Sequence, residues 1–220
     1  MTIYREKGRL DDLTIGLCGD LKFGRTVHSL VAAMSRCTGI RFVLISPEEL
    51  KLPRYVKDEY LKKPGVPYTQ STSLEAVMPE LDVLYMTRVQ KERFSDAAEY
   101  ERLKNVYVLD EEKLKLAKHD MIVMHPLPRV GEISADVDDD PRCCYFEQTR
   151  CGRFIRMALI LRLLSDISEP DVKRMSESFE ENGRRCGNPR CITSCEQELA
   201  HRFYTDANGI VRCAYCDTGC

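Results

Sequence analysis

The sequence predicts an α/β protein in which a parallel sheet with helices on both faces forms three layers, followed by a small cysteine-rich domain that resembles a zinc ribbon. Two observations predict this organisation. From Thr14 onward, short β-rich apolar runs alternate with segments of helical periodicity, and strands separated by helices form parallel sheets covered on both faces. In addition, six of the eleven cysteines fall within the last 35 of the 220 residues. This clustering indicates a second, smaller domain.

The elements follow one another after a polar N-terminal stretch. Residues 1–12 are predicted to be the end of a preceding helix or linker, and residues 13–165 to be the α/β domain. The predicted strands are short apolar runs: Thr14–Cys18, Arg41–Ile45, Pro67–Thr69, Val83–Met86, Val106–Leu109 and Met121–Met124. The predicted helices have apolar residues at helical spacing: Arg25–Cys37, Arg54–Lys63, Leu74–Met78, Glu111–Lys118 and Cys151–Ile167.

The last of these helices is apolar on most of its sides. A helix of that kind is normally buried, so we expect it to pack either against this sheet or against a partner domain. After it, Ser, Glu, Pro, Asn and Gly dominate residues 166–185, which are predicted to form a linker. Residues 186–220 form the predicted metal-binding domain.

Composition excludes several classes of function. The 33 Lys and Arg residues nearly balance the 35 Asp and Glu residues, so a general attraction to nucleic acid or to a membrane surface is not expected. Neither a membrane-spanning run nor the apolar core of a signal peptide is present in the sequence. We therefore expect a cytoplasmic protein, and in a reducing compartment clustered cysteines favour metal binding over disulfides.

One stretch, Leu17–Leu30, combines the features of a ligand-binding turn. A strand is followed by a loop with two glycines and then by a helix that begins near Arg25 and Thr26. Open α/β sheets bind ligands at the edge formed by such turns. The alternative is an ordinary turn whose glycines only relieve backbone strain.

Four cysteines have the spacing of a metal site. Cys186 and Cys191 form a C-x4-C pair, and Cys213 and Cys216 form a C-x2-C pair after 21 intervening residues. Four thiolates suit tetrahedral zinc in a closed structural site, and a segment this short needs such a staple to fold. A redox pair at Cys213 and Cys216, or unpaired surface thiols, are the alternatives. Two further cysteines of this segment, Cys195 and Cys220, lie outside the four ligand positions.

Several motifs resemble those of a known family. The stretches Gly19–Leu30, Leu84–Arg93 and His125–Arg129 resemble, in this order, the aspartate-binding half of aspartate carbamoyltransferase. The sister ornithine enzymes share the fold and the His-Pro-Leu-Pro region. The cysteine motifs in turn resemble the zinc domain of the regulatory chain of the same enzyme. The resemblance implies transfer of a carbamoyl group from carbamoyl phosphate to L-aspartate in pyrimidine biosynthesis, with structural zinc and no organic cofactor.

The resemblance also implies roles for individual residues. Arg25 and Arg88 would bind the two carboxylates of L-aspartate, with hydrogen bonds from Thr26 and Gln90, because paired guanidinium donors match carboxylate geometry. Taken singly, each arginine would more simply form an ordinary surface ion pair. The charged stretch from Lys91 to Tyr100 is either a solvated face or, by resemblance, a loop that moves on domain closure.

The His-Pro-Leu-Pro loop is expected to contact the second substrate. By resemblance, the carbonyl groups of Leu127 and Pro128 receive the amino group of carbamoyl phosphate, and the Leu127–Pro128 bond is cis. Gly131 stands where the family usually has Asp. The loop therefore lacks a carboxylate that would be expected to anchor it. Five further residues are expected to support the site: Lys22, Arg93, His125, Arg129 and Glu132. Of these, His125 is expected to have a structural role, and Arg129 is expected to belong to an interdomain contact network.

The family's other half is not recognised in the sequence. Its Ser-Thr-Arg-Thr phosphate-binding loop and its catalytic histidine are missing, as is the nucleotide-binding domain of the regulatory chain. We therefore expect a piece of a fused catalytic–regulatory protein that begins at the interdomain helix. It would need the missing carbamoyl-phosphate domain and would form a trimer-based homo-oligomer when complete. We expect no binding to nucleic acid or to membranes. The rival hypothesis is a non-catalytic assembly or regulatory module that acts through the zinc domain.

Overall fold

The computed structural model describes residues 1–90, 96–165, 185–189, 191–195, 201–206, 209–216 and 218–219. The chain divides into two compact units, Met1–Arg156 and Met157–Cys220. The predicted linker over 166–185 lies outside the described residues, apart from Arg185. Cys220 and the charged residues 91–95 lie outside them as well.

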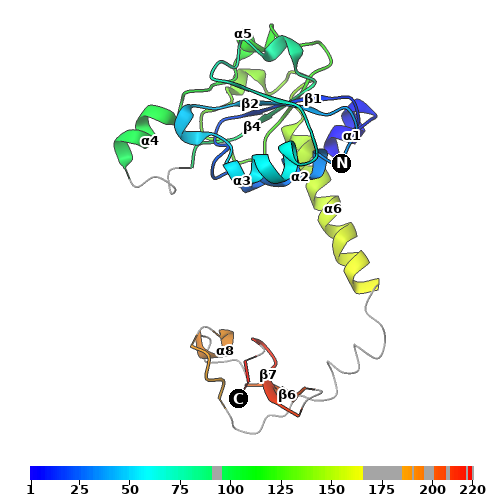
Figure 1. Ribbon diagram of the computed structural model, residues 1–220, viewed down its shortest axis with the longest axis vertical. Coiled ribbons are helices and arrows are strands. Elements are labelled where there is room, and N and C mark those ends of the chain that lie inside the picture. The colour runs from blue at the N-terminus through cyan, green and yellow to red at the C-terminus, as the bar shows by residue number, and fades with distance from the viewer. Residues whose placement is uncertain are drawn as a thin grey trace. The chain divides into compact units, whose positions relative to one another are not determined.

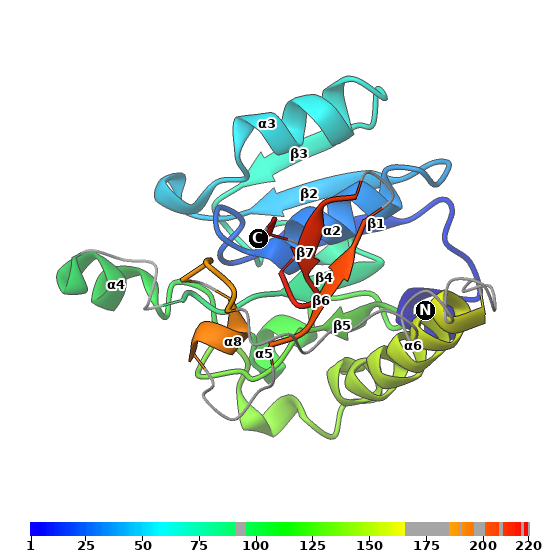
Figure 2. The same cartoon turned by 90° about the horizontal axis from the view of Figure 1, so that it is seen from below.

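The larger unit is built on a five-stranded sheet whose order is β3-β2-β1-β4-β5, with every pairing parallel (Figures 1 and 2). Its strands are β1 (Thr14–Cys18), β2 (Arg41–Ile45), β3 (Tyr68–Ser71), β4 (Val83–Met86) and β5 (Ile122–Met124). In the central strand, Cys18 pairs with Ile45 of β2 and Met86 of β4. The carboxyl ends of these strands therefore lie level at one edge of the sheet.

Helices cover both faces of this sheet. The α helices of the larger unit are α1 (Thr2–Lys7), α2 (Arg25–Met34), α3 (Arg54–Lys57), α4 (Ala97–Leu103), α5 (Glu111–Leu114) and the first part of α6 (Tyr145–Ser165). Shorter helical turns are η1 (Glu48–Leu50), the π-helical η2 (Asp58–Lys62), η3 (Met78–Glu80) and η5 (Ala135–Val137). In Figure 1, α2 and α3 lie on one side of the sheet and α5 on the other.

The alternation of side chains along the strands produces two cores. Ile15 and Leu17 of β1 pack with Val27 and Val31 of α2 in one fully buried cluster. Cys18 belongs to the cluster on the opposite face. Strands buried on both faces account for the continuous apolar runs that the sequence shows.

Several predicted elements differ from the observed ones. The predicted strand Val106–Leu109 is wrong, because Leu109 makes only an isolated parallel bridge to Ile133 and the sheet ends at β5. The predicted helix Leu74–Met78 is a turn that leads into η3.

Other predicted bounds shift by a few residues. The helix predicted to reach Cys37 ends at Met34, and the one predicted to reach Lys118 ends at Leu114. The helix predicted over Arg54–Lys63 is divided into α3 and η2. In the opposite direction, α6 begins six residues before the predicted Cys151.

The apolar helix is expected to be buried, either against this sheet or against a partner domain, and its second half is exposed in this chain. From Arg153 to Ser165, every residue of α6 is exposed, including Leu161 at 66%. The beginning of the helix is anchored, because Glu147 forms an ion pair with Arg5 of α1 and Tyr145 is fully buried. Figure 2 shows α1 beside α6. Of the helices in the described part of the chain, none is long and apolar enough to cross a membrane.

In the part of the smaller unit that the structure describes, the end of α6 is followed by a short helix and a two-stranded antiparallel sheet. These elements are α8 (Ile192–Cys195), β6 (Phe203–Thr205) and β7 (Val211–Cys213). Phe203 is buried against the buried cysteines Cys186, Cys191 and Cys213. Among the described residues, this core consists of one aromatic ring, several thiols and Val211 packed against them. A core of this size is small, so we expect the unit to need a cross-link such as a metal ion.

Candidate functional site

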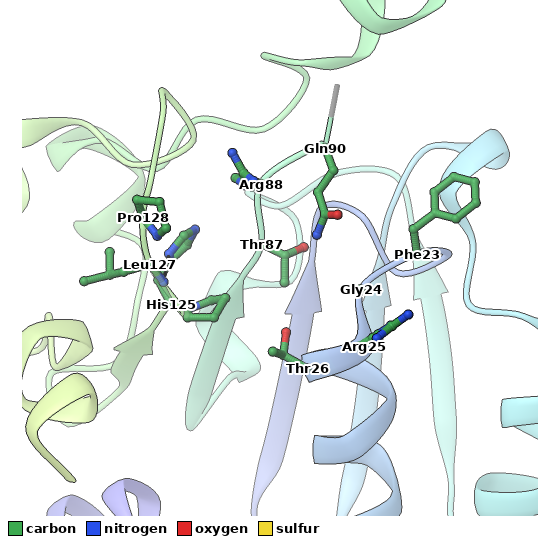
Figure 3. A pocket seen from close by; sticks show the side chains of 11 residues that line it. Phe23, Gly24, Arg25, Thr26, Thr87, Arg88, Gln90, His125, Leu127 and Pro128 are labelled. Atoms are coloured by element: carbon green, nitrogen blue, oxygen red, sulfur yellow. Dashed lines mark hydrogen bonds between the residues drawn. The ribbon is translucent and has the colours of Figure 1, made fainter. Parts of the chain in front are cut away.

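A pocket of about 230 Å³ lies at the carboxyl edge of the parallel sheet. Figure 3 shows three segments that contribute to it. They are the turn and first residues of α2, the chain that follows β4, and the chain that follows β5. The lining residues are Phe23, Gly24, Arg25, Thr26, Thr87, Arg88, Gln90, His125, Pro126, Leu127 and Pro128.

The turn between β1 and α2 is held closely against the end of β4. Gly19 has a φ of 109°, and a Cβ atom there would lie 2.3 Å from the carbonyl oxygen of Thr87. The next residue, Asp20, donates its backbone N–H to Thr87 Oγ1 at 2.9 Å, and this hydroxyl donates to the carbonyl of Cys18 at 3.0 Å. Only glycine fits this approach, because it has no Cβ and accepts positive φ.

Asp20 organises the inner part of the turn. Its side chain is fully buried, and Oδ1 accepts the backbone N–H of Phe23 at 2.9 Å. Its Oδ2 atom has no hydrogen-bond partner among the described residues. Burial raises the pKa of the Asp20 carboxyl, and the hydrogen bonds from the turn act in the opposite direction.

Two arginines lie at this pocket. Arg25 is exposed and is the first residue of α2, whereas Arg88 is half-buried just after β4. In Figure 3 their side chains lie on opposite sides of the pocket, with Gln90 between them. Thr26 follows Arg25 in the first turn of α2. Guanidinium groups on either side of a small pocket suit a ligand with two carboxylates.

His125 fixes the loop on the other side of the pocket. Its side chain is completely buried, and its Nδ1 accepts the backbone N–H of Leu127 at 2.8 Å. Its Nε2 therefore carries the proton and donates to Glu132 Oε1, also at 2.8 Å. Its backbone N–H donates to Gln148 Oε1 at 2.9 Å. Leu127 has a φ of 48°, and the Leu127–Pro128 bond is cis, which confirms the prediction.

Glu132 anchors the loop in the absence of the Asp expected at Gly131. Its Oε2 accepts the backbone N–H groups of Val130 at 3.1 Å and of Gly131 at 3.0 Å. Burial alone would raise the pKa of Glu132. The hydrogen bonds from His125 and the backbone outweigh burial and lower this pKa to about 2. A side chain at position 131 is therefore not needed to hold the loop.

The other expected supporting residues do not line the pocket. Arg129 donates from Nη2 to Asp138 at 2.5 Å, and its guanidinium lies 5.6 Å from the ring centre of Tyr145. This pairing lowers the pKa of the Asp138 carboxyl. Lys22 is exposed, with its Nζ 5.0 Å from the ring centre of Phe23. Arg93 lies outside the described residues.

Sequence reasoning missed several residues that build the site. Thr87 and Asp20 stand inside the recognised motifs, but their mutual hydrogen bond joins the chain after β1 to the chain after β4, which are distant in sequence. Gln148 and Asp138 come from later segments, and no local pattern links them to the loop they support. Phe23 was visible as an aromatic residue in the turn, and only the fold shows that it lines the pocket.

The smaller unit brings the four predicted ligand cysteines together. The ligand sulfurs of Cys186, Cys191, Cys213 and Cys216 all lie within 4.8 Å of one another. The Cys186–Cys216 sulfur distance is 3.5 Å, and that of Cys191–Cys213 is 3.7 Å. Zinc–sulfur bonds of about 2.3 Å in a tetrahedron place the sulfurs about 3.8 Å apart, so the cluster fits a tetrahedral metal ion.

Neighbouring groups support this cluster. Thr193, which is buried, donates its hydroxyl to Cys191 Sγ at 3.2 Å. The backbone N–H of Cys186 donates to His201 Nδ1 at 3.3 Å. The hydroxyl group that donates to Cys191 Sγ stabilises the thiolate form that a metal requires. The side chain of Cys195 and all of Cys220 lie outside the described residues.

The fold and these two sites define a ligand-binding α/β domain with a separate cysteine-based metal module. The family described as "Aspartate/ornithine carbamoyltransferase, Asp/Orn binding domain" matches residues 11–163. A second family, "Aspartate carbamoyltransferase regulatory chain, metal binding domain", matches residues 181–220. The chain belongs to the aspartate/ornithine carbamoyltransferase family, and it carries the Asp/Orn-binding domain together with this metal-binding domain.

Curated relatives of this chain are aspartate carbamoyltransferase catalytic subunits. The aspartate carbamoyltransferase catalytic subunit of Lachnoclostridium phytofermentans is 59% identical over 169 residues, which are 77% of this chain and 55% of that subunit. The corresponding subunit of Clostridium novyi is 61% identical over 164 residues, which are 74% of this chain and 53% of that subunit. The chain thus spans about half the length of the relatives it matches.

Solved structures agree with this result. The catalytic subunit of the M. jannaschii aspartate transcarbamoylase superposes with a TM-score of 0.70 at 44% identity, covering 76% of this chain and 55% of that one. The Trypanosoma cruzi enzyme, solved with carbamoyl phosphate and aspartate, superposes with a TM-score of 0.67 at 44% identity. That match covers 72% of this chain and 52% of the T. cruzi chain.

Proposed function

We propose that this chain supplies the L-aspartate-binding half of an aspartate carbamoyltransferase. The complete enzyme transfers the carbamoyl group of carbamoyl phosphate to the amine of L-aspartate, giving N-carbamoyl-L-aspartate and phosphate for pyrimidine biosynthesis. The observation that carries the proposal is the pocket that Arg25 and Arg88 line together with the loop of His125–Pro128. Relatives named for this activity support it.

In this proposal the pocket works by positioning and charge. Arg25 and Arg88 each take one carboxylate of L-aspartate, while Thr26 and Gln90 add hydrogen bonds that orient its amine. The carbonyl groups of Leu127 and Pro128 accept hydrogen bonds from the carbamoyl amino group. Holding two reactants in register contributes roughly 7–11 kcal/mol toward lowering a barrier, and fixed charges stabilise the oxyanion that forms on attack.

The proposed activity needs a second protein part. The chain matches about half of each relative, and the carbamoyl-phosphate domain is expected to come from the other half. In the complete protein, catalytic subunits would assemble as trimers, by the family resemblance. Without that half, we expect Arg25 and Arg88 to bind aspartate weakly or undetectably, because ion pairs that face water contribute only about 0–1 kcal/mol.

We further propose that the metal of the smaller unit is zinc in a structural role. Four thiolates leave no open coordination position for a substrate or a water, which is typical of structural zinc. Cysteine ligands and tetrahedral spacing also fit this ion better than oxygen-preferring metals.

A coexpression experiment tests the proposed function. The chain is produced together with the part of the C. novyi catalytic subunit that it does not match, and carbamoyl transfer is measured with L-aspartate and, separately, with L-ornithine. We expect product from L-aspartate only, and none from either chain alone. Equal use of L-ornithine would contradict the assignment of the arginines, and absence of both activities in a stable complex would favour the non-catalytic assembly module.

A further inference from the structure

Tyr85 of β4 is buried beneath the pocket segments and is not among the residues that line the pocket. Its ring lies in the core cluster that contains Val27 of α2 and Met124 of β5, and the residue is 5% exposed. In the sheet, Tyr85 pairs with Leu17 of β1 and with Met124. A buried tyrosine hydroxyl needs hydrogen-bond partners. The partners of this hydroxyl therefore show which parts of the site the residue connects.

These partners come from two different helices. The side chains of Thr26 and Gln148 form hydrogen bonds with the Tyr85 hydroxyl. Burial raises the pKa of the Tyr85 phenol, and these two hydrogen bonds act in the opposite direction. Thr26 lines the pocket from the first turn of α2, whereas Gln148 belongs to the first turn of α6. Figure 3 shows Thr26 at the start of α2, on the aspartate side of the pocket in the proposed function.

Gln148 continues the connection to the loop after β5. Its Oε1 accepts the backbone N–H of His125 at 2.9 Å, so its Nε2 group is the part of the amide that donates to Tyr85. The start of α6 is itself joined to β5, because Cys144 donates its backbone N–H to the carbonyl of Val123 at 2.9 Å. Gln148 donates its own backbone N–H to the carbonyl of Cys144 at 2.8 Å. Both the backbone and the side chain of Gln148 are therefore held in place.

His125 completes the path into the pocket. Its Nδ1 accepts the backbone N–H of Leu127 at 2.8 Å, and Leu127 is one of the residues proposed to hold the carbamoyl group. A continuous series of hydrogen bonds, here called the relay, therefore runs through Thr26, Tyr85, Gln148, His125 and Leu127. One end of the relay is proposed to orient L-aspartate, and the other end is proposed to orient carbamoyl phosphate.

We propose that Tyr85 and Gln148 are positioning residues that hold the aspartate side of the pocket at a fixed distance from the carbamoyl side. Neither residue touches substrate in this proposal. Attack requires the reacting atoms to lie about 3–3.5 Å apart, so a small shift between the two sides slows the reaction while each substrate keeps its own contacts. The inference rests on the proposed function. It adds the two residues that couple the binding of one substrate to the placement of the other.

Steady-state kinetics test the relay in the complex with the unmatched part of the C. novyi catalytic subunit. Tyr85→Phe removes only the hydroxyl, and we expect kcat to fall about tenfold while the KM values of both substrates change less than about twofold. Tyr107→Phe is the matched control. Tyr107 is also buried, and its hydroxyl donates to the carbonyl of Thr72 at 3.0 Å in the other core cluster. If the role of Tyr85 were merely structural, the two variants would lose equal amounts of kcat for equal losses in thermal midpoint.

Amide hydrogen exchange in the free chain tests the connection without catalysis. Tyr85→Phe removes one anchor of the Gln148 amide, so the backbone N–H of His125 should exchange at least about fivefold faster, as expected for a locally weakened hydrogen bond. Tyr107→Phe should leave this rate unchanged. Gln148→Met removes the acceptor and should have a larger effect. Gln148→Glu keeps an acceptor for the same N–H and should restore the exchange rate to within about twofold of the wild type.

The two experiments separate the relay from the proposed function. A wild-type complex without carbamoyl transfer would overturn the proposed function, and the exchange rates would still decide whether Tyr85 holds the loop. Three results would overturn the relay: a kcat that falls no further in Tyr85→Phe than in Tyr107→Phe, a KM for aspartate that rises as much as kcat falls, or a wild-type exchange rate at His125 in Tyr85→Phe. If Tyr85→Phe does not fold, Gln148→Met is compared with Tyr107→Phe by the same criteria.

Discussion

The Nε2 atom of His125 lies 2.8 Å from Oε1 of Glu132, and both side chains are buried. Because Nδ1 of the same ring accepts the N–H of Leu127, the imidazole connects a buried carboxylate to the backbone that faces the pocket. The carboxylate also holds Val130 and Gly131. The shape of this loop therefore depends on one charged side chain.

Replacing that carboxylate should loosen the loop. Glu132→Gln cannot accept hydrogen bonds from His125 and from two backbone N–H groups with the same strength, since one of its acceptor oxygens becomes a donor. We expect a loss of about 1–3 kcal/mol in the free energy of unfolding, measured by urea denaturation. Glu112→Gln is the matched control, because Glu112 is exposed and its ion pair with Lys115 lies at the surface; a loss as large in this control would refute the explanation.

The pH dependence of stability should carry the signature of Glu132. Its folded-state pKa of about 2 lies below the ordinary value of 4.5, so its contribution is fully present above pH 4.5. It is lost as the pH falls from about 4.5 to about 2, because the unfolded chain then binds the proton more readily. Urea denaturation across this range should show a smaller acid-dependent loss in Glu132→Gln than in the wild type. Parallel curves for the two proteins would mean that other carboxylates govern the acid transition.

Asp20 is predicted to shape the aspartate pocket without touching substrate. Asp20→Ala removes the acceptor for the N–H of Phe23 and should release the turn that carries Arg25. In the complete enzyme we expect a higher KM for aspartate, by roughly tenfold, since the loss of a buried hydrogen bond costs about 1–3 kcal/mol. Steady-state kinetics with aspartate as the varied substrate measure it. An unchanged KM in a folded variant would show that the turn holds its shape without Asp20.

The smaller unit should contain one equivalent of zinc and should unfold without it. Structural zinc contributes roughly 10–16 kcal/mol in small domains, far more than the core around Phe203 can provide. Elemental analysis of protein purified without added metal should give about one zinc per chain, and Cys213→Ser should reduce it. Cys37→Ser is the control, since Cys37 lies outside the cluster. Less than half an equivalent with all thiols reduced would contradict the metal site.

The sequence predicted the central part of the sheet well and its margins less well. The strands β1, β2 and β4 have their predicted bounds, because burial on both faces makes them apolar beyond the first residues of β1 and β2, Thr14 and Arg41. The edge strand β3 is polar at Gln70 and Ser71, so its end was missed. The run Val106–Leu109 is apolar because Tyr107 and Leu109 are buried under the sheet rather than within it.

The site was predictable only as far as its motifs reached. Residues following β1, β4 and β5 were expected to meet at one edge, because parallel strands bring them there. The bonds from Asp20 to Thr87 and from His125 to Gln148 depend on the three-dimensional arrangement of distant segments. The apolar composition of α6 predicted that the helix is covered by other protein. It could not show whether this sheet or a partner domain covers it, because an apolar helix is consistent with both.

The most direct test of this account is the aspartate dependence of carbamoyl transfer in the complete enzyme carrying Arg88→Ala. A charge-assisted hydrogen bond contributes about 1.5–3 kcal/mol, so kcat/KM for aspartate should fall by roughly 10- to 150-fold, with Arg54→Ala as an exposed control that leaves it unchanged. The account predicts that this loss appears in aspartate recognition while the complex remains assembled. Full activity of the Arg88→Ala enzyme, or turnover by the isolated 220-residue chain, would contradict it.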